Sequence, residues 1–549
     1  MKKILIVTLL VETSPQALPL GAACIASALK ADFEIAKACS VKLLDFSSED
    51  FKEESPSKTI AEAIIKEKPD YAGFSIFIWN HESLAEAATL VKKNMPDVTL
   101  FCGGPEVTAN PENFKGLFDY VISGEGESQC VKLIRKLCGI KENSSEKNES
   151  AYCPALVSPY LDGTLDPEKY AGALWELARG CPFRCSYCFE SKGEKKIVHF
   201  PEDRLKRELD LFRKKKIKQI WVLDPTYNAD KKRAAAILDY IRHTAPDIFF
   251  HFEVRAEFLD KELIQKFAAV NSSLQIGIQS IHEDVLKNVN RTFNKKDFTK
   301  KISMLNNAGV IFGFDLIFGL PGDTLSKFCQ SIDFALSLYP NHLELFKLSI
   351  LPGTALYDDC TEQNGKEKKF DLTFMQKPPY HIIESSTYTK EDIKKASKLS
   401  AAASLFYTQG RAVSWFLSVL YPLKMRPSVF FRDFARWLDE NYGGAESQYK
   451  KCLPHSQIEK LQVDFVSKVF SDKGLSSLVK AAKDLICLNG ALTRAYAEGR
   501  TEILLLNYHP DELLSVWSQD LKQFTRYAHS RTYRVKTFPV KNGSDYRIM

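Results

Sequence analysis

The sequence predicts an α/β protein in three parts: an N-terminal doubly wound parallel sheet, a central partial (β/α)6 barrel and a mainly helical C-terminal domain. Two successive series of short apolar runs alternate with amphipathic stretches, which is the pattern of parallel strands joined by crossover helices. Between the series, residues 141–150 (KENSSEKNES) offer nothing to bury. Beyond about residue 385 the strand pattern gives way to long amphipathic segments. We expect domains at 1–140, 171–385 and 386–549, with a linker at 141–170.

The expected strands of the first two parts are short and mostly apolar. For the N-terminal sheet the pattern gives strands at 3–9, 41–45, 71–77, 98–102 and 120–123, and helices at 20–30, 58–67, 83–94 and 127–137. For the barrel it gives strands at 174–178, 219–223, 249–254, 274–278, 312–318 and 343–350. A last apolar run at 503–506 is a candidate short strand within the helical part.

Bulk composition is that of a folded globular protein, with 45% hydrophobic and 26% charged residues among 549. We expect no membrane span, because no stretch approaches the roughly 18 uninterrupted apolar residues that one needs. Residues 2–11 could be read as a signal peptide, but a loop and a helix follow, so we predict a buried strand. The thirteen cysteines are too scattered for a disulfide scaffold, which favours a reducing cytoplasm.

The formal charge of +6 is unevenly distributed. From residue 390 onward there are 25 Lys and Arg against 16 Asp and Glu, so the basic surplus lies in the C-terminal part. Such a tail could bind RNA or a phosphorylated substrate, although a solvated helix surface is the simpler interpretation.

The most specific motif is the cysteine triad Cys181, Cys185 and Cys188, which follows the first predicted barrel strand. Three thiolates at C-x3-C-x2-C spacing can wrap one loop around a 4Fe–4S cube and leave one iron open to a small ligand. Structural zinc would require a fourth ligand, and the nearest histidine, His199, comes eleven residues after Cys188. The motif therefore predicts an open iron–sulfur cluster, with zinc or unrelated buried cysteines as the alternatives.

With the aromatic Tyr187 just before the third cysteine, this loop resembles the cluster loop of the radical S-adenosylmethionine (SAM) superfamily, and the resemblance covers about residues 174–383. It implies a partial (β/α)6 radical SAM barrel whose cluster is held by Cys181, Cys185 and Cys188. In that family the amino and carboxylate groups of SAM bind the open iron, and an electron from the cluster splits SAM into methionine and a 5′-deoxyadenosyl radical.

Further SAM contacts are implied at the carboxyl ends of the barrel strands. Asp224 and Thr226 stand where the family usually has a Gly-Gly-Glu-like element, from which this sequence departs. Glu253 and Arg255, which we expect to be buried two apart on a predicted strand, face the same side and can pair with each other or with a zwitterion; a structural ion pair is equally consistent. The full set implied for SAM is Tyr187, Asp224, Thr226, Glu253, Arg255, Gln279, Ser280 and Leu351.

In the N-terminal part, glycine, small or aromatic residues follow four predicted strands. They are Pro19 and Gly21; Ser75, Ile78 and Trp79; Gly103, Gly104, Pro105 and Glu106; and Gly124, Glu125, Gly126 and Glu127. Such an edge admits a flat ligand because glycines remove side-chain bulk, and a nucleotide would suit it as well. Together with the barrel, these motifs resemble the Rossmann-like cobalamin-binding domain fused to some radical SAM barrels.

The sequence lacks the D-x-H-x-x-G motif whose histidine binds cobalt. The resemblance therefore implies cobalamin without a protein histidine ligand. Ile78 and Trp79 could cover the lower face of cobalt, and core packing is the competing interpretation.

The function that the resemblance implies is methyl transfer to an unactivated carbon, using SAM, a 4Fe–4S cluster and cobalamin. The alternatives are a cobalamin-assisted rearrangement or cyclisation without methyl transfer, a tRNA methylthiotransferase, and a non-catalytic cobalamin or redox sensor. We expect an electron donor such as flavodoxin or ferredoxin, and a small molecule, a peptide or, less readily, RNA as substrate. The region after residue 385 resembles the helical extension of barrels that carry a segment like 224–228. No catalytic side chain is identifiable from the sequence.

Overall fold

The computed structural model describes residues 1–51, 55–141, 156–192, 197–362, 367–541 and 543–549. Residues 142–155 of the predicted linker at 141–170 lie outside these residues. The chain divides into two compact units: 1–274 with 349–381, and 275–348 with 382–549. The domain boundaries expected from the sequence follow the motifs rather than this division, and they stay predictions.

The N-terminal part contains the expected five-stranded parallel sheet, in the order β2-β1-β3-β4-β5. Its strands are β1 (Lys2–Leu10), β2 (Cys39–Ser47), β3 (Tyr71–Ser75), β4 (Thr99–Gly103) and β5 (Tyr120–Val121). Its main helices are α1 (Leu20–Ala31), α2 (Phe33–Ala38), α3 (Pro56–Glu67), α4 (His81–Asn94), α5 (Pro105–Ala109) and α6 (Gly126–Leu137). The Rossmann-like prediction is confirmed, and the short helices α2 and α5 are additions to the predicted set.

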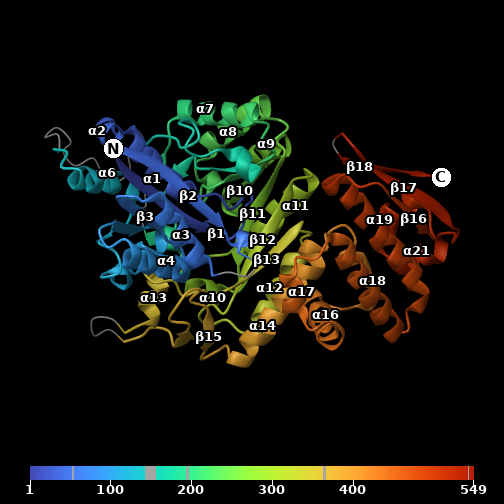
Figure 1. The fold of residues 1–549 in the computed structure, drawn as a ribbon. Coiled ribbons are helices and arrows are strands. Elements are labelled where there is room, and N and C mark those ends of the chain that lie inside the picture. Colours follow the sequence, from blue (N-terminus) through green and yellow to red (C-terminus); the bar gives the residue numbers. More distant parts are fainter. Residues whose placement is uncertain (52–54, 142–155, 193–196, 363–366, 542) are drawn as a thin grey trace. The chain divides into compact units, whose positions relative to one another are not determined.

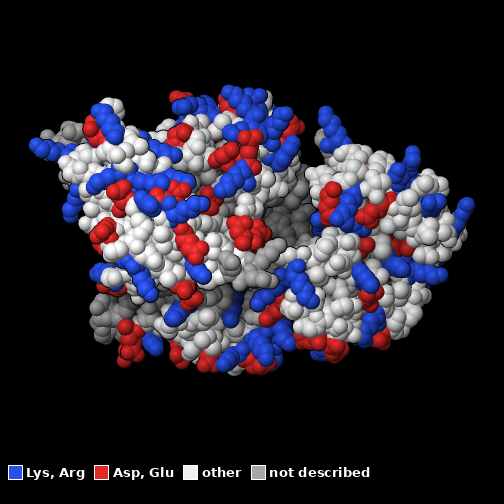
Figure 2. Space-filling view, viewed as in Figure 1, with Lys and Arg blue, Asp and Glu red and all other residues white. Residues whose placement is uncertain are grey.

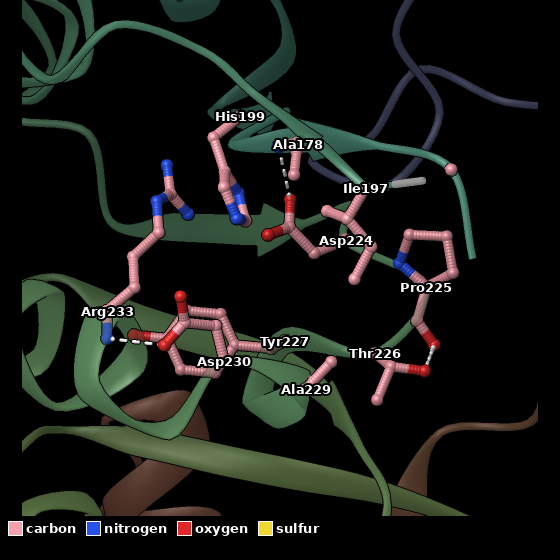
Figure 3. Close-up of a pocket in the computed structure, with 11 residues that line it drawn as sticks. Ala178, Ile197, His199, Asp224, Pro225, Thr226, Tyr227, Ala229, Asp230 and Arg233 are labelled. Carbon is pink, nitrogen blue, oxygen red and sulfur yellow. Dashed lines mark hydrogen bonds between the residues drawn. The ribbon is translucent and has the colours of Figure 1, made fainter. Parts of the chain in front are cut away.

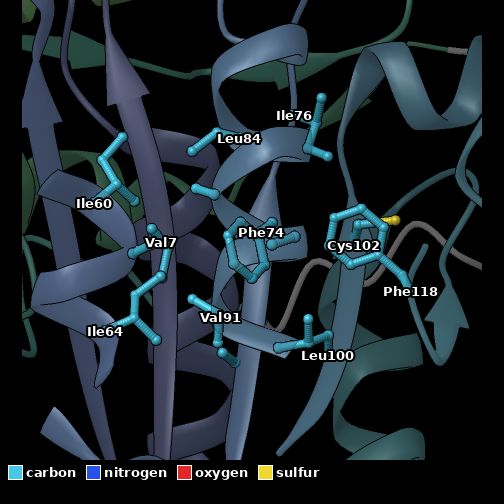
Figure 4. Packing of buried hydrophobic residues seen from close by; sticks show 14 of the residues in the cluster. Val7, Ile60, Ile64, Phe74, Ile76, Leu84, Val91, Leu100, Cys102 and Phe118 are labelled. Atoms are coloured by element: carbon cyan, nitrogen blue, oxygen red, sulfur yellow. The ribbon is translucent and has the colours of Figure 1, made fainter. Parts of the chain in front are cut away.

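Helices cover both faces of this sheet (Figure 1). Side chains of β1 alternate between two cores: Leu5, Val7 and Leu9 pack with α3 and α4, whereas Ile4 and Ile6 pack with α1 and α6. Figure 4 shows the first core, in which Val7 and Phe74 lie among aliphatic side chains of the helices. Burial on both faces explains why β1 is apolar from Ile4 to Val7 and again at Leu9 and Leu10, and it confirms the strand prediction for these residues.

The central part contains a six-stranded sheet in the order β13-β12-β11-β10-β9-β6. Its strands are β6 (Gly172–Trp175), β9 (Gln219–Val222), β10 (Phe249–Val254), β11 (Ser272–Gln279), β12 (Ile311–Phe318) and β13 (His342–Lys347). The helices between them include α7 (Glu202–Lys214), α8 (Lys231–Thr244), α9 (Lys261–Ala268), α11 (Lys295–Asn307) and α12 (Leu325–Leu336). Strands that follow one another in sequence are neighbours in space, as the (β/α)6 prediction requires.

The first barrel strand differs from the prediction. Instead of one strand over 174–178, β6 ends at Trp175, and Ala178–Arg179 forms β7, which pairs antiparallel with β8 (Val198–His199). The chain leaves the sheet at this point because the backbone N–H groups of Leu177 and Ala178 donate to the carboxylate of Asp224.

The C-terminal part is mainly helical, as expected. Its helices are α14 (Lys390–Ala403), α15 (Phe416–Leu423), α16 (Pro427–Tyr442), α17 (Ala445–Lys450), α18 (His455–Asp472), α19 (Val479–Glu498), α20 (Pro510–Leu513) and α21 (Leu521–Tyr527). The candidate strand at 503–506 is confirmed as β16 (Glu502–Leu506), which pairs with an unexpected hairpin of β17 (Tyr533–Val540) and β18 (Gly543–Ile548).

Basic and acidic side chains are interspersed on the face shown in Figure 2, including over the C-terminal helices. Lys398 pairs with Asp439 at 2.6 Å and Arg411 with Glu498 at 3.0 Å. These pairs partly neutralise the basic surplus of the C-terminal part, which supports the interpretation as a solvated helix surface. No described helix combines the length and the apolar character that crossing a membrane would demand.

Candidate functional site

The cysteine triad lies on an irregular loop between β7 and β8. Cys185 is buried, while Cys181 and Cys188 are partly exposed, so the loop turns its thiols toward an accessible side. Gly180 begins the loop with φ +91°, a left-handed conformation that side chains other than glycine avoid. The backbone N–H of Cys188 donates to the carbonyl of Cys185 at 3.1 Å, which closes a tight turn between the second and third thiols.

The chemistry of this donor set fits an iron–sulfur cluster. Burial raises the pKa of the Cys181 thiol, and hydrogen bonds from the backbone N–H of Phe183 and the side chain of Thr226 act in the opposite direction. Within the described ranges, no three His, Cys, Asp or Glu side chains converge as ligands of one metal ion. A cube does not require that convergence, because each of its thiolates binds a different iron.

The segment that follows the last barrel strand contacts the cluster loop. The carbonyl of Ser186 accepts a hydrogen bond of 2.8 Å from the N–H of Leu356 in α13 (Ala355–Cys360). The turn before α13 begins at the half-buried Leu351, whose carbonyl accepts the hydroxyl of Thr354 at 2.7 Å. The segment after the last barrel strand therefore contacts the cluster loop directly.

Asp224 connects the end of β9 to the start of the cluster loop. Its Oδ1 accepts the N–H groups of Leu177 and Ala178, both at 2.9 Å, and the residue is 5% exposed. Burial raises the pKa of this carboxyl to about 7, although the two hydrogen bonds and Arg233 act in the opposite direction. The carboxyl thus has a structural role, and its predicted contact with SAM stays a prediction.

The next residues of this segment lie equally deep. Thr226 is 7% exposed and donates its hydroxyl to the carbonyl of Pro225 at 2.8 Å. Asn228 is fully buried and exchanges two hydrogen bonds of 2.9 Å with the backbone of Arg255, at the end of β10. The segment 224–228 therefore joins the carboxyl ends of three neighbouring strands, β6, β9 and β10. The sequence alone did not reveal this positioning role of Asn228.

Arg255 meets the cluster loop through the ring of Phe183, over which its guanidinium lies at 4.1 Å. The guanidinium also pairs with Glu257, with Nε 3.2 Å from Oε2. Glu253 is exposed, so the prediction that Glu253 is buried with Arg255 is wrong. An exposed carboxylate on the same strand remains accessible to a ligand.

A pocket adjoins the cluster loop (Figure 3). It comprises about 300 Å³ of space, part of which is open to solvent, and is lined by Ala178, Gly180, Ile197, His199, Asp224, Pro225, Thr226, Tyr227, Ala229, Asp230 and Arg233. Burial and the nearby Arg233 lower the pKa of His199, which favours its neutral form. The pocket thus places a neutral imidazole and a carboxyl that titrates near neutrality beside the residue that precedes Cys181.

In the second unit, β11 ends in a strained residue. Gln279 has φ +66° and is 9% exposed, and its Oε1 has no hydrogen-bond partner. Its side chain occupies the space that a Cβ on Gly277 would need, with Nε2 2.5 Å from that position. The hydroxyl of the buried Ser280 accepts the N–H of His282 at 3.2 Å. The unsatisfied oxygen of Gln279 is compatible with a ligand contact, which stays a prediction.

The carboxyl edge of the N-terminal sheet presents both open and engaged residues. Pro19 is buried before α1, while Gly21 is exposed and has nothing within 4 Å of where a Cβ would lie. The carbonyl of Ser75 accepts a hydrogen bond of 3.3 Å from Asn80. Ile78 is half-buried and Trp79 is 49% exposed, with its ring stacked on Phe77 at 4.4 Å. Trp79 is therefore not a core residue, and its apolar surface is accessible at this edge.

The loop after β4 is built around glycine. Gly104 has φ +111°, and a Cβ there would lie 2.5 Å from the carbonyl oxygen of Ile76. Gly103 is half-buried and Pro105 is exposed at the first position of α5. Glu106 is 2% exposed and its carboxylate contacts His81 Nδ1 at 3.1 Å and the hydroxyl of Tyr380. Glu106 and His81 thus engage each other, and a cobalamin contact of Glu106 stays a prediction.

The loop after β5 is joined to the segment before the cluster. Gly124, with φ +84°, is exposed, and a Cβ on Gly126 would lie 2.8 Å from Ile25. Glu125 and Glu127 both contact the guanidinium of Arg179, at 3.5 Å and 2.8 Å. Arg179 is a residue that sequence reasoning missed, because ion pairing between distant segments leaves no local pattern.

These features fit a flat ligand at the sheet edge. Gly21, Gly124 and Trp79 provide small or apolar exposed surface there. The loop of residues 11–19 contains no histidine, and the nearby His81 uses Nδ1 for Glu106 and packs on Phe114 at 4.9 Å. The donor set thus fits cobalamin held without a histidine from this loop.

Two family models match the chain. One described as Radical SAM superfamily matches residues 175–335, and one described as B12 binding domain matches residues 6–134. The first match contains β9, β10, β11 and β12 of the six-stranded sheet, and the second runs from within β1 of the five-stranded sheet into α6.

Curated relatives include two methyltransferases. The cobalamin-dependent radical SAM methyltransferase TokK of Streptomyces tokunonensis is 26% identical over 375 residues, which cover 61% of this chain and 54% of TokK. The 2-(S-pantetheinyl)-carbapenam-3-carboxylate methyltransferase of Streptantibioticus cattleyicolor is 24% identical and covers 52% of this chain and 48% of its own length. The chain thus spans about half the length of these relatives.

Solved structures show the same fold. The radical SAM methyltransferase TsrM of Kitasatospora setae, with cobalamin and a 4Fe–4S cluster bound, matches 69% of this chain and 82% of its own with TM-score 0.53 and 15% identity. The cobalamin-dependent radical enzyme OxsB, with aqua-cobalamin and SAM bound, matches 86% and 80% with TM-score 0.56 and 16% identity.

Proposed function

Since the chain belongs to the radical SAM enzymes that carry a B12-binding domain, we propose that it transfers a methyl group from SAM to an unactivated carbon. The observation that carries the proposal is the presence, in one compact unit, of a cluster loop and a sheet edge that fits a flat ligand. The names of its relatives support the choice of methyl transfer, because both curated relatives described above are methyltransferases.

The residues of this chain bind and orient the cofactors. When bound, the cluster with SAM supplies a carbon-centred radical, and cobalamin supplies methyl-transfer chemistry. Cys181, Cys185 and Cys188 would hold the cluster, and Asp224 fixes the backbone that leads into their loop. Phe183 of the same loop packs against the guanidinium of Arg255, which follows β10.

We propose a flavodoxin or ferredoxin as electron donor and the cytoplasm as location, because a cluster with an open iron needs a low-potential reductant and a reducing compartment. A small molecule or a peptide is the proposed class of substrate. RNA is the weaker choice, since the basic C-terminal surface carries paired charges.

The test uses anaerobically reconstituted protein with hydroxocobalamin, a reductant and SAM labelled in its methyl group, incubated with pools of candidate substrates. Label in a new carbon–carbon bond supports the proposal. An altered product without label identifies a rearrangement or cyclisation instead, and label on sulfur attached to a nucleoside identifies methylthiotransfer. Cobalamin binding without any cleavage of SAM would indicate a sensor and contradict enzymatic function.

A further inference from the structure

We infer that Arg179 is a positioning residue that clamps the loop after β5 to the cluster loop, and thereby sets the distance between the cobalamin site and the cluster. The inference rests on the two cofactor sites of the proposed function. It does not depend on which reaction the two cofactors perform.

The clamp consists of one guanidinium and three carboxylates. Within its own segment, Arg179 donates from Nε to Glu176 Oε1 at 2.8 Å and from Nη2 to Glu176 Oε2 at 3.2 Å. These two parallel hydrogen bonds to one carboxylate form a fork that fixes the plane of the guanidinium. On the other side, Nη2 lies 2.8 Å from Glu127 Oε1 and Nη1 lies 3.5 Å from Glu125 Oε2. Nη2 thus donates a hydrogen bond to Glu127 in the first turn of α6, whereas Nη1 lies near the charge of Glu125 without a hydrogen bond to its Oε2.

These contacts are shielded from water. The side chain of Arg179 is 18% exposed and that of Glu127 is 9% exposed. An ion pair at such a site is screened little by salt, and removing one partner leaves the other charge without compensation. The pairing therefore restrains both loops, unlike an exposed pair on a helix surface.

The position of Arg179 in the chain transmits this restraint to the cluster. Only Gly180 separates Arg179 from Cys181 in the sequence. The backbone of Arg179 is also held by its antiparallel pairing with Val198 in β8. Glu125 ends the loop after β5 and Glu127 lies in the first turn of α6, on the edge that fits cobalamin. A displacement of the guanidinium therefore moves a cluster ligand relative to the cobalamin loop.

The clamp also has an electrostatic consequence. Glu125, Glu127 and Glu176 bring three negative charges to a point two residues from a cluster ligand, and Arg179 supplies the compensating positive charge. Negative charge near a cluster favours its oxidised form. Without Arg179, we expect the cluster to be harder to reduce.

Helix α6, which carries Glu127, also offers a matched control for the loss of a buried ion pair. Arg135, near the end of α6, pairs with Asp32 at 2.7 Å with side chains 12% and 7% exposed. This pair is as buried as the clamp, but it joins two elements of the N-terminal part. Arg135→Met therefore tests the effect of losing a buried ion pair that does not reach the cluster loop.

The experiment uses holoprotein with cluster and cobalamin, without substrate, both reduced to paramagnetic forms. The magnetic interaction between them gives their separation, and a redox titration gives the cluster potential. We expect Arg179→Met to broaden the distribution of separations and to shift the potential to more negative values. We expect Arg179→Lys to be intermediate, because it retains the charge but loses the fork, and Arg135→Met to match the wild type.

Glu127→Gln provides a second variant, distant in sequence from the cysteines, should Arg179→Met fail to retain its cluster. It should broaden the separation as well. A separation and a potential identical to those of the wild type in Arg179→Met, or an unchanged separation in Glu127→Gln, would overturn the inference. Wild-type holoprotein that shows a fixed separation but never methylates a substrate would refute only the proposed reaction.

Discussion

Asp224 offers a substitution in which two roles of one carboxyl can be separated. In Asp224→Ala the buried N–H groups of Leu177 and Ala178 lose their common acceptor. An unsatisfied buried donor costs about 1–3 kcal/mol, so we expect the two together to cost about 2–6 kcal/mol of the free energy of unfolding. Asp224→Asn retains an acceptor oxygen at the same place, and we expect it to keep both hydrogen bonds.

The charge of Asp224 predicts a dependence on pH. Burial raises its pKa from 3.8 to about 7, so the folded protein holds this proton more tightly than the unfolded chain does. The resulting stabilisation is complete below about pH 4 and is lost as the pH rises through 7, which corresponds to about 4 kcal/mol in total. The neutral amide of Asp224→Asn escapes this loss. We therefore expect the variant to gain on the wild type as the pH rises from 5 to 8.

Urea unfolding of the cluster-free protein at pH 5 and pH 8 measures both effects, with Asp203→Asn as a control for the loss of one exposed negative charge on α7. Iron content after reconstitution should fall in Asp224→Ala and persist in Asp224→Asn, because only the first releases the backbone before the cluster loop. Two results would contradict these expectations. One is equal destabilisation of Asp224→Ala and Asp224→Asn, and the other is a difference in the free energy of unfolding between Asp224→Asn and the wild type that is the same at pH 5 and pH 8.

Three further substitutions test other parts of the site. Cys185→Ala should lose iron and sulfide on reconstitution. Cys24 is buried in α1, and Cys24→Ala should retain both. Iron and sulfide retained in both variants would contradict the assignment of the cluster to this loop. Gly104→Ala should lower the free energy of unfolding by about 1–3 kcal/mol because its φ and the carbonyl of Ile76 oppose a side chain, and an unchanged melting temperature would contradict this. Gly21→Ala should raise helix stability by roughly 0.5–1 kcal/mol in the cobalamin-free protein and weaken cobalamin binding; unchanged affinity in a titration would place the ligand elsewhere.

The sequence was informative where periodicity or spacing carries the structure. Strands β1 and β3 follow from runs that are buried on both faces, and the triad at 181–188 follows from the spacing of cysteines alone. These features are local, so no partner from elsewhere in the chain is needed to recognise them.

The parts that were missed depend on distant partners. The split of the first barrel strand results from the carboxylate of Asp224, which lies 46 residues after Ala178. Arg179 and Asn228 have roles only through loops that folding brings to them. The exposure of Glu253 could not be inferred from strand alternation, which assigns a face but not the environment that this face meets.

The hairpin of β17 and β18 was not predicted from the sequence. Its strands carry several charged residues, among them Arg534, Lys536 and Arg547, so their apolar alternation is weak. Pairing with β16 and packing on α19 compensate for this weak pattern in the folded protein.

The central claim is that the loop of three cysteines leaves one iron accessible to SAM. Electron paramagnetic resonance of the anaerobically reconstituted, reduced protein, recorded before and after SAM is added, tests it most directly. The account predicts a 4Fe–4S signal whose g values change when SAM binds. A spectrum that SAM leaves unaltered, or one without a 4Fe–4S signal, would contradict it.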